Sequence, residues 1–317
     1  MNFDQLKTRF QWVKKSPYSL FIYNEIKRRS RFFTFSNLDD KQAIEELYKR
    51  YTGREIDWVN HKRFTEKLQL LKFYYSKDPF IGKLVDKYRV REYIEQKGYG
   101  QTLNTLIGAW TNVNDIKLDQ LPEKFVLKAA HGSSWNIICK DKRELEKRWR
   151  IYKKLMNSWL KQDLSVYGRE GFFHFAEPRI ICEQFLQDKS GALIDYKFFC
   201  FNGKVKFIQV DFDRYGDWRK NFYTENWDMF DLQTSKPHFN DDGFKPKNLE
   251  AMVAMAKDFS KDYPYLRVDL YEVDGRIVFG ELTFIDGCGF YTFNPDEYDF
   301  IMGEWLELPD SIEDYVQ

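Results

Sequence analysis

The sequence predicts an α+β fold that begins with a helical N-terminal extension. Residues 1–60 are rich in charge and place apolar side chains at helical spacing. After Pro122, short apolar runs typical of strands alternate with single helices. Two later dipeptides, Asn202-Gly203 and Asp274-Gly275, are strong hairpin signals. The first third of the chain is therefore expected to be helical and the rest to be built around sheets.

Composition restricts the class of protein. The 317 residues hold 50 Lys and Arg against 49 Asp and Glu, so the net charge of +1 gives no support for a dedicated nucleic-acid binder. The length fits one large domain or a few small ones. No run of about 18 apolar residues exists, which argues against a transmembrane helix. The four cysteines are widely spaced within apolar runs, which favours a reduced, cytoplasmic compartment.

Three helices are expected between residues 39 and 98. Each carries apolar residues three or four positions apart and is flanked by residues that start or stop helices. A residue that precedes proline disfavours helical dihedral angles, and glycine readily adopts the left-handed conformation that ends a helix. The expected signals are Asp39-Asp40 and Gly53, then Phe64 and Asp78-Pro79, then Asp86 and Gly98.

The remaining elements follow from alternation, turn residues and capping patterns. Strands are expected where β-branched and aromatic residues cluster, and helices where Asp141 with Glu144, or Asn248, precedes an apolar stripe. The region from about 213 to 245 is rich in Asp, Asn and Gly, and is expected to be a long loop or insertion. The expected strands are Lys124–Ala129, Trp135–Lys140, Arg179–Glu183, Asp195–Phe201, Lys204–Asp211, Tyr265–Glu272 and Arg276–Phe284.

Aromatic residues make up 18% of the chain, and two interpretations are open. They can form a Phe-rich core with Tyr at its rim, or they can stack against sugar rings. The stretch Tyr215–Phe230, with Trp218, Tyr223 and Trp227, is the candidate for sugar stacking. The alternative there is a locally packed insertion.

A first candidate site combines Lys128 with the loop His131-Gly132-Ser133-Ser134 that follows its strand. A lysine on a rigid strand can neutralise a phosphate, and a Gly/Ser loop lets backbone N–H groups approach phosphate oxygens. The spacing is not that of a P-loop. An edge-strand lysine beside an ordinary turn is the alternative.

A second candidate site consists of Asp269 and Glu281, with Arg267 nearby, all within apolar strands. Buried carboxylates need a paired or bound cation. The pair can hold Mg²⁺ and a triphosphate, or Glu281 can form a salt bridge with Arg267. A two-residue turn at Asp274-Gly275 would place the carboxylates on opposite faces of the hairpin. The metal interpretation therefore predicts a three-residue loop with Gly275 at positive φ, which brings the two carboxylates to one face.

Two weaker signals complete the set. Glu183 ends a strand whose backbone groups are suited to the edge of an adenine. Asp211-Phe212-Asp213 resembles the DxD motif of glycosyltransferases, which binds a metal and a nucleotide sugar, although the alternating βαβ units of such enzymes do not precede it.

Taken together, the spaced motifs resemble those of the TupA-like ATP-grasp family, which is linked to the biosynthesis of surface polysaccharide and teichuronopeptide. The resemblance covers about residues 60–305. It implies an ATP-grasp fold, in which two α+β lobes clasp ATP. The implied regions are 1–60 (helical extension), 61–120 (pre-ATP-grasp region), 121–185 (central lobe) and 186–317 (C-terminal lobe). The motifs that carry it are Asp86–Tyr93, Phe125–Lys142, Ile180–Leu186, Asp195–Lys204 and Arg267–Phe284.

The resemblance also implies a role for each matching residue. It implies phosphate-binding lysines, a closing loop, an adenine hinge, ribose or phosphate contacts, metal ligands, an arginine that steadies the tetrahedral intermediate, and an oxyanion-donor turn. The family's third metal ligand is typically Asn, but here that position is a threonine, a weaker ligand. The implied phosphate-binding lysines are Lys87 and Lys128, and the implied closing loop consists of His131, Gly132, Ser133 and Ser134. The implied adenine hinge contains Glu183 and Leu186, and the implied ribose or phosphate contacts are Asp195 and Lys197. The implied metal ligands are Asp269, Glu281 and Thr283, the implied arginine is Arg267, and the implied oxyanion-donor turn contains Gly287.

The resemblance implies an ATP- and Mg²⁺-dependent carboxylate–amine ligase that acts through an acyl-phosphate in the cytoplasm. Its expected partners are a hexuronic-acid unit of a surface glycan and an amino acid or amine. Two alternatives are a glycosyltransferase that uses Asp211 and Asp213, and a non-catalytic glycan-binding protein suggested by the aromatic residues. Buried carboxylates argue against the second alternative, because a binding module does not need them.

Overall fold

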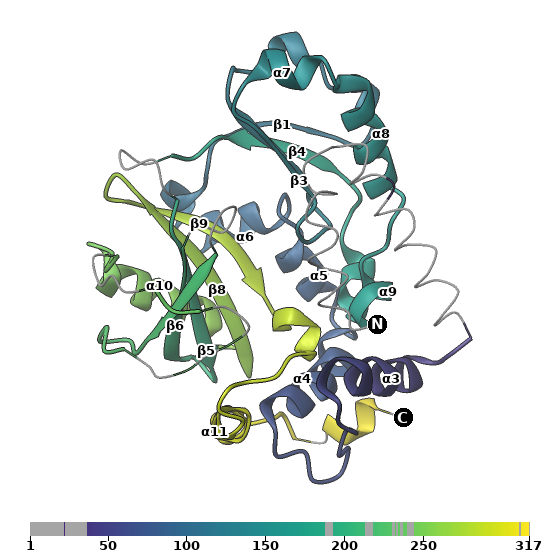
Figure 1. The fold of residues 1–317 in the computed structure, drawn as a ribbon, viewed down its shortest axis with the longest axis vertical. Helices are drawn as coiled ribbons and strands as arrows, with labels where there is room; N and C mark the ends of the chain where they lie inside the picture. The colour runs from purple at the N-terminus through teal and green to yellow at the C-terminus, as the bar shows by residue number, and fades with distance from the viewer. Residues whose placement is uncertain are drawn as a thin grey trace.

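Two antiparallel sheets dominate the described chain, and helices lie between and around them (Figure 1). The computed structural model describes residues 22, 37–187, 193–212, 218–229, 232, 234, 237–239, 244–310 and 312–316. One sheet has the strand order β1-β4-β2-β3 and the other β7-β6-β5-β8-β9. The predicted α+β class is thereby confirmed. Most of the predicted helical extension, residues 1–36, lies outside the described residues.

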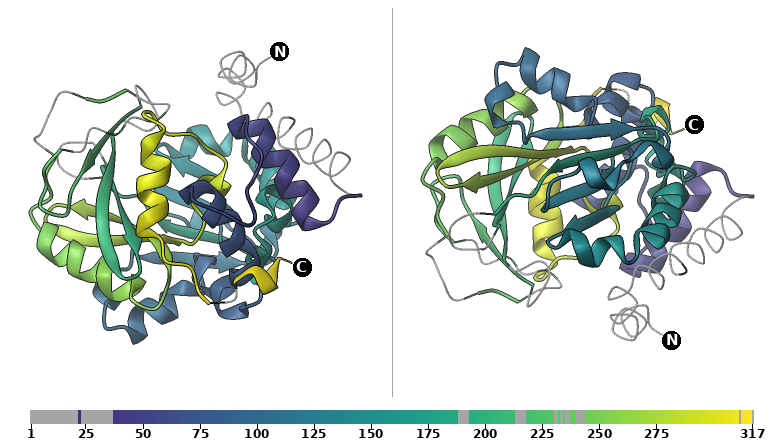
Figure 2. Two further views of the ribbon diagram at one scale, coloured as in Figure 1. Left: turned by 90° about the horizontal axis from the view of Figure 1, so that it is seen from below. Right: turned by 90° about the horizontal axis from the view of Figure 1, so that it is seen from above.

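The four-stranded sheet is covered on one face by α7 and α8, as the view from above shows (Figure 2). Phe125, Leu127 and Ala129 on β2 are buried in the core that includes Trp159 of α8. Lys128, between Leu127 and Ala129, points to the opposite face of the sheet. β1 was not predicted, and its pairing with β4 is irregular around Gly108. The elements are β1 (Leu106–Trp110), β2 (Phe125–Ala129), β3 (Asn136–Cys139), β4 (Ile180–Gln184), α7 (Lys142–Glu146) and α8 (Trp149–Trp159).

The five-stranded sheet packs against α10 and contains both predicted hairpins. Asn202 and Gly203 both have positive φ, as expected for a tight hairpin turn. The expected long loop at 213–245 needs a correction, because residues 219–223 of it form the edge strand β7, paired with β6. The elements are β5 (Asp195–Phe201), β6 (Lys204–Phe212), β7 (Arg219–Tyr223), β8 (Tyr265–Val273), β9 (Arg276–Thr283) and α10 (Leu249–Ser260).

Helices α3 and α4 lie at the base of the molecule together with the C-terminal α11, and α4 packs against α11 (Figure 1). Asp39 forms a capping box at the start of α3, and Gly53, at φ 76°, ends it as predicted. Asp78-Pro79 ends α4 but also starts α5, a helix that was not predicted. The helices are α3 (Asp40–Thr52), α4 (Phe64–Tyr75), α5 (Pro79–Val85), α6 (Val90–Gln96), α9 (Ser165–Gly168) and α11 (Glu297–Trp305). Short 3₁₀ turns are η2 (Gly100–Thr102), η3 (Val113–Asp115), η4 (Leu118–Gln120), η5 (Gly171–Phe175), η6 (Asp286–Gly289) and η7 (Ile312–Tyr315).

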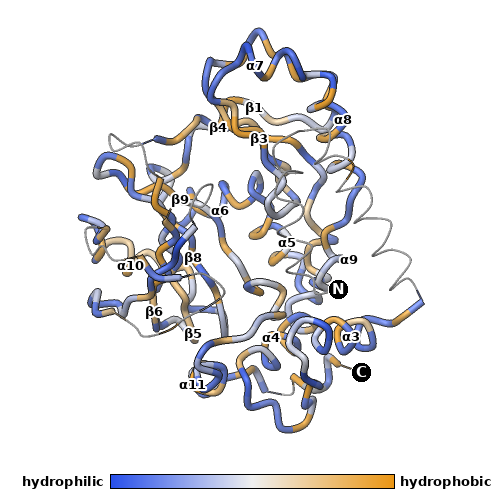
Figure 3. The backbone as a smooth tube through the Cα atoms, in the orientation of Figure 1, coloured by the Kyte–Doolittle hydropathy of each residue, from blue (hydrophilic) through white to orange (hydrophobic). Residues whose placement is uncertain are grey.

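Each sheet has its own hydrophobic core, so the cleft between the sheets can be polar. Figure 3 shows hydrophobic colour along the strands of the four-stranded sheet, whereas the outer helix α7 is largely hydrophilic. Many aromatic rings lie in these cores: Phe64, for example, contacts Phe201 and Tyr265. No helix in the described part of the chain is both long and apolar enough to cross a membrane.

Candidate active site between the two sheets

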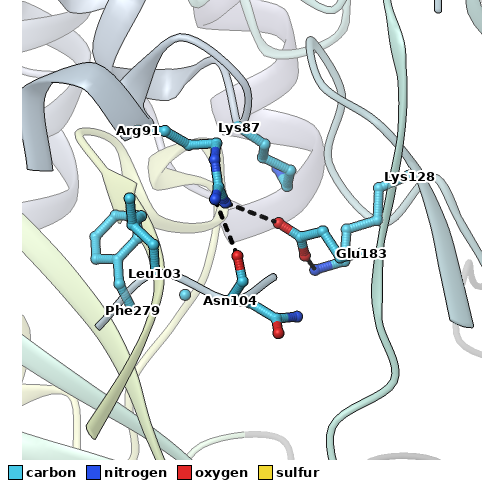
Figure 4. A pocket seen from close by; sticks show the side chains of 8 residues that line it. Lys87, Arg91, Leu103, Asn104, Lys128, Glu183 and Phe279 are labelled. Carbon is cyan, nitrogen blue, oxygen red and sulfur yellow. Dashed lines mark hydrogen bonds and ion pairs between the residues drawn. The ribbon is translucent and has the colours of Figure 1, made fainter. Parts of the chain in front are cut away.

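A polar cleft lies where the four-stranded sheet faces β9 of the five-stranded sheet (Figure 4). Its cations come from three elements: Lys87 precedes α6, Arg91 lies on α6, and Lys128 lies on β2. Phe279 and Gly280 of β9 line the opposite side. A cleft with three cations is suited to a strongly anionic ligand such as a nucleoside triphosphate.

Lys128 and Glu183 form a close ion pair on neighbouring strands. The Lys128 Nζ lies 2.6 Å from Glu183 Oε2, and a guanidinium nitrogen of Arg91 lies 3.7 Å from the other carboxylate oxygen. Glu183 is only 8% exposed, so these two cations balance a buried charge. The Arg91 guanidinium also donates to the Asn104 carbonyl, as Figure 4 shows. Lys128, predicted as a phosphate ligand, therefore lies beside the strand end predicted as the adenine hinge.

Lys87 connects the two sheets. Its Nζ donates to the Gly132 carbonyl at 2.8 Å and lies 3.3 Å from Glu281 Oε2 on β9. Its backbone N–H donates to the Ala130 carbonyl, which holds Lys87 beside the predicted phosphate loop. Asp86 is fully buried and accepts from backbone N–H groups on both sides of this turn. A predicted phosphate lysine is thus in contact with a predicted metal ligand.

His131 anchors the predicted phosphate loop from inside. The ring is 3% exposed; Nδ1 accepts from the Arg179 N–H, and Nε2 donates to the Trp159 carbonyl at 3.0 Å. Burial lowers the pKa of His131, which fits a neutral ring. Both ring nitrogens are engaged, so the structure places the His131 side chain as an anchor rather than as a phosphate ligand. Ser133 and Ser134 are exposed, and Ser134 has a φ of 60°.

The β8–β9 hairpin brings the two predicted metal ligands to one face by an unexpected route. The predicted three-residue loop is wrong, because Val273 pairs directly with Arg276 across a two-residue turn. A β-bulge between Leu270 and Asp269 then shifts the register by one residue. Asp269 consequently lies directly opposite Glu281.

Glycine makes this bulge possible. A Cβ atom at Gly280 would lie 2.8 Å from the Asp269 carbonyl oxygen, too close for any other residue without a backbone shift. Gly275 has a φ of 81°, so the predicted positive φ is confirmed although the turn type is not.

Arg267 lies at the centre of this face. Its guanidinium holds Asp269 through two bonds of 2.6 and 2.8 Å, lies 3.2 Å from Glu281 Oε1, donates to the Thr283 hydroxyl, and forms an ion pair with Asp286. Burial opposes the charge, but Asp269 and Asp286 outweigh it and raise the pKa of Arg267 well above its usual value. Glu281 therefore lies opposite Asp269, as the metal-site prediction requires, and is also paired with Arg267, as the alternative requires.

Lys197 and Asp195, predicted to contact ribose or phosphate, extend the same charged face. The Lys197 Nζ lies 2.6 Å from Asp195 and 2.5 Å from Asp269, and all three side chains are buried. Leu186 follows β4 in the predicted hinge, and a second hollow beside it is lined by Pro122 and Phe185.

The donor set on this face fits a magnesium ion bound together with a nucleotide. Mg²⁺ in phosphate-transferring sites uses one or two carboxylates and completes its shell with phosphate oxygens and water. Asp269 and Glu281 supply two carboxylates, and the Thr283 hydroxyl lies 3.5 Å from Glu281 Oε1. Among the described residues, no group of three or more Asp, Glu, His or Cys side chains forms a separate metal cage. The chain's own residues thus fit an ion that is held jointly with phosphates.

Sequence reasoning missed two charged residues of this face. Asp286 pairs with Arg267, and its signal was its place directly before Gly287 in the predicted oxyanion turn. Lys220 lies on β7 opposite Asp211, and burial lowers its pKa while Asp211 and Asp286 act in the opposite direction. No signal pointed to Lys220, since its strand was not predicted.

Of the two acids of the DxD motif, Asp211 lies within the described residues. Asp211 is 1% exposed, accepts from Gln209 at 2.9 Å and lies 4.0 Å from the Lys220 Nζ. Asp213 lies outside the described residues. Asp211 therefore belongs to the same charged face as Asp195.

Gly287 has a φ of 53° within η6, the turn that carries Asp286. A Cβ atom there would lie 2.9 Å from the Tyr291 ring. The turn follows directly from the strand that bears Glu281 and Thr283, so the predicted oxyanion-donor position lies next to Arg267 and its partner Asp286.

Two antiparallel sheets that enclose a basic cleft, with opposed carboxylates at its edge, are the arrangement expected of an ATP-grasp fold. The family model of the TupA-like ATP-grasp proteins matches residues 66–307, so the chain belongs to this family. No functionally curated protein matches the sequence.

Several solved ligases are similar in structure at low identity. The D-alanine–D-alanine ligase of Bacillus anthracis, solved with ATP, is 16% identical over 64% of this chain and 54% of its own, with a TM-score of 0.39. The D-alanyl-alanine synthetase A of Vibrio cholerae is 12% identical over 74% and 63%, also with a TM-score of 0.39. The D-cycloserine synthetase DcsG is 13% identical over 72% of both chains, with a TM-score of 0.39. This chain spans just over half the length of the first.

Proposed function

We propose that this protein is an ATP-dependent ligase that joins a carboxylate to an amine through an acyl-phosphate. The observation that carries the proposal is the contact between Lys87 and Glu281 across the cleft. The Nζ of Lys87, which we propose binds phosphate, lies 3.3 Å from Oε2 of Glu281 on β9, which we propose binds the metal. A nucleoside triphosphate bound there would contact both Lys87 and a metal ion held by Glu281.

Each part of the charged face has a role in this chemistry. Lys87 and Lys128 neutralise the phosphates, and Ser133 and Ser134 of the loop cover them. Mg²⁺, when bound by Asp269 and Glu281, supplies charge neutralisation for the transferred phosphoryl group. Arg267, fixed by Asp269 and Asp286, is placed to stabilise the anion that develops when the amine attacks.

The cleft also has to exclude water, because water would hydrolyse an acyl-phosphate. The Lys87 Nζ bonds to the Gly132 carbonyl, so the loop and β9 are already linked. We propose that this link holds the loop beside β9, where the loop limits the access of water to the acyl-phosphate.

For the substrates we propose a hexuronic acid of a surface polysaccharide and an amino acid or amine, in the cytoplasm, where ATP is present. Family membership supports this assignment. The aromatic residues near β7 give it little further support: Trp227 is stacked on Tyr223 at 4.2 Å between ring centroids, and Tyr215 lies outside the described residues. Trp218 is partly exposed, and the Lys220 Nζ lies 5.1 Å from its ring, so Trp218 is the candidate for sugar stacking among the described residues of this stretch.

A screen for ADP release tests the proposal. Uronic acids and amino acids are supplied in pairs with Mg-ATP, and ADP release that needs both partners is expected. In parallel, thermal-shift measurements compare Mg-ATP with magnesium and UDP-sugars. Stabilisation by UDP-sugars and not by ATP would favour the glycosyltransferase alternative and contradict the ligase.

A further inference from the structure

Several buried polar atoms around the turn η6 have no hydrogen-bond partner within the described chain. They are the Lys72 Nζ, the Gln69 Oε1 and the Tyr291 hydroxyl. Gln69 donates through its Nε2 to the Gly289 carbonyl, and the Tyr291 ring lies against Gly287, so these groups surround one turn. Buried polar groups are rarely left unpaired, which indicates that water or a polar ligand completes this place.

The same place contains two opposite charges that are not joined. Lys72 is 1% exposed and Glu170 is 6% exposed, yet no ion pair links them in the described chain. The Lys72 ammonium lies 3.8 Å from the centroid of the Phe290 ring. Among the described residues, the side-chain hydrogen bond that Glu170 accepts is the weak one from the Cys288 thiol, at 3.1 Å. Burial lowers the pKa of Lys72 to about 8 and raises that of Glu170, since neither charge is fully compensated.

Glycines allow the polar side chains of this place to approach the backbone closely. A Cβ atom at Gly168 would lie 2.6 Å from Cys288 Sγ and 2.7 Å from Glu170 Oε2. A Cβ atom at Gly289 would lie 2.3 Å from Gln69 Nε2. Any other residue at either position would displace the side chains of Cys288, Glu170 or Gln69.

The cluster adjoins the reaction centre. Cys288 is two residues after Asp286, which pairs with Arg267, and one residue after Gly287. An amine held beside this turn would be near the carbonyl carbon of an acyl-phosphate steadied by Arg267. Helix α3 covers the place, since Ala43 and Leu47 pack with Phe290.

We propose that Lys72, Glu170 and Gln69 form the subsite for the attacking substrate, and that this substrate is a free amino acid rather than a simple amine. Lys72 binds the α-carboxylate. Glu170 and the Gln69 Oε1 accept from the α-ammonium. A zwitterion satisfies both separated charges and the unpaired acceptor, which neither a carboxylic acid nor an amine alone can do. The inference rests on the proposed ligase function.

Calorimetric titration of the full chain loaded with Mg-ADP tests the subsite. The probes are the standard L-amino acids and, for the tightest binder, its decarboxylated amine and its deaminated acid. Each matched analogue is expected to bind roughly 10- to 100-fold more weakly, because it leaves one buried charge unpaired. Lys72→Met and Glu170→Gln should each weaken amino-acid binding by a similar factor and leave Mg-ADP binding unchanged. Lys77→Met, an exposed change at the end of the same helix, should alter neither.

Different results would contradict the ligase function and the amino-acid subsite. If wild-type protein does not bind Mg-ADP, the ligase function itself is contradicted. If Mg-ADP binds but no amino acid does, or if the decarboxylated amine binds as well as the amino acid, the subsite is overturned and the unpaired atoms are hydrated by water only. Unchanged amino-acid affinity in Glu170→Gln, which preserves side-chain shape, would overturn it even if Lys72→Met fails to fold.

Discussion

Replacing Glu281 by glutamine separates the metal site from a purely structural ion pair. In the protein without nucleotide, Glu281 lies 3.3 Å from the Lys87 Nζ and 3.2 Å from the Arg267 guanidinium. After Glu281→Gln, Arg267 still holds Asp269 through two bonds and pairs with Asp286. Lys87 still donates to the Gly132 carbonyl. No buried cation is left unpaired by the change.

The expected magnitudes differ for stability and for binding. The Glu281 side chain is 36% exposed, so solvent screens its ion pairs and their loss should lower the free energy of unfolding by about 1 kcal/mol or less. The loss of a charged metal ligand should weaken Mg-ATP binding by about 1.5–3 kcal/mol, or roughly 10- to 150-fold. ATP without magnesium should bind more tightly than to wild type, because Lys87 is released from Glu281.

Calorimetric unfolding and titration with ATP, with and without magnesium, measure all three quantities on one variant. Glu304→Gln on α11 is the matched control, since Glu304 is exposed and distant in sequence from the cleft. A loss of about 3–5 kcal/mol in unfolding free energy, with unchanged Mg-ATP affinity, would show that Glu281 serves to neutralise Arg267. That result would refute the metal-site reasoning.

Three further perturbations test other parts of the cleft. Lys128→Met should weaken ATP binding at least roughly tenfold, because a charge-assisted contact to phosphate is lost. The control Lys140→Met, an exposed change directly after β3, should leave ATP binding unchanged. Equal ATP titration curves for the two variants would contradict the role of Lys128 in phosphate binding. His131→Gln should remove a pH dependence of stability, because the pKa of His131 in the folded protein lies below its ordinary 6.5. The wild type should therefore lose stability relative to the variant as the pH falls below about 6.5. Unfolding free energies that stay parallel for the two proteins from pH 7.5 to 5 would refute the role of His131 as an anchor. Gly280→Ala should lower the free energy of unfolding by about 1–3 kcal/mol and reduce the affinity for Mg-ATP, because the added Cβ would meet the Asp269 carbonyl and shift the bulge. An unchanged melting temperature with unchanged affinity would show that the bulge does not position Asp269 and Glu281.

Strong local signals explain which elements could be predicted. Asp39 and Gly53 frame α3 through a capping box and a left-handed glycine, and Asn202-Gly203 forms the expected turn. These features depend on a few adjacent residues, so the sequence contains them in full. The strands of Lys128 and Asp269 were predicted for the same reason.

Features that depend on contacts distant in sequence could not be predicted. The strand β7 exists because it pairs with β6, although its own sequence resembles a loop. The register of the final hairpin was predicted from the turn alone, yet Gly280 corrects it further along the strand; a glycine inside a strand was the available signal for a bulge. His131 resembled a ligand, and only the fold brings Trp159 and Arg179 to its ring.

Oxygen transfer from the carboxylate to phosphate tests the central claim most directly. The protein is incubated with Mg-ATP, an amino acid and glucuronic acid labelled with ¹⁸O in its carboxylate, and the released phosphate is analysed by mass spectrometry. An acyl-phosphate route predicts that each phosphate released carries one ¹⁸O from the carboxylate, because the amine displaces phosphate together with that oxygen. ADP and phosphate formed in the presence of the labelled acid, but without label in the phosphate, would contradict the ligase mechanism.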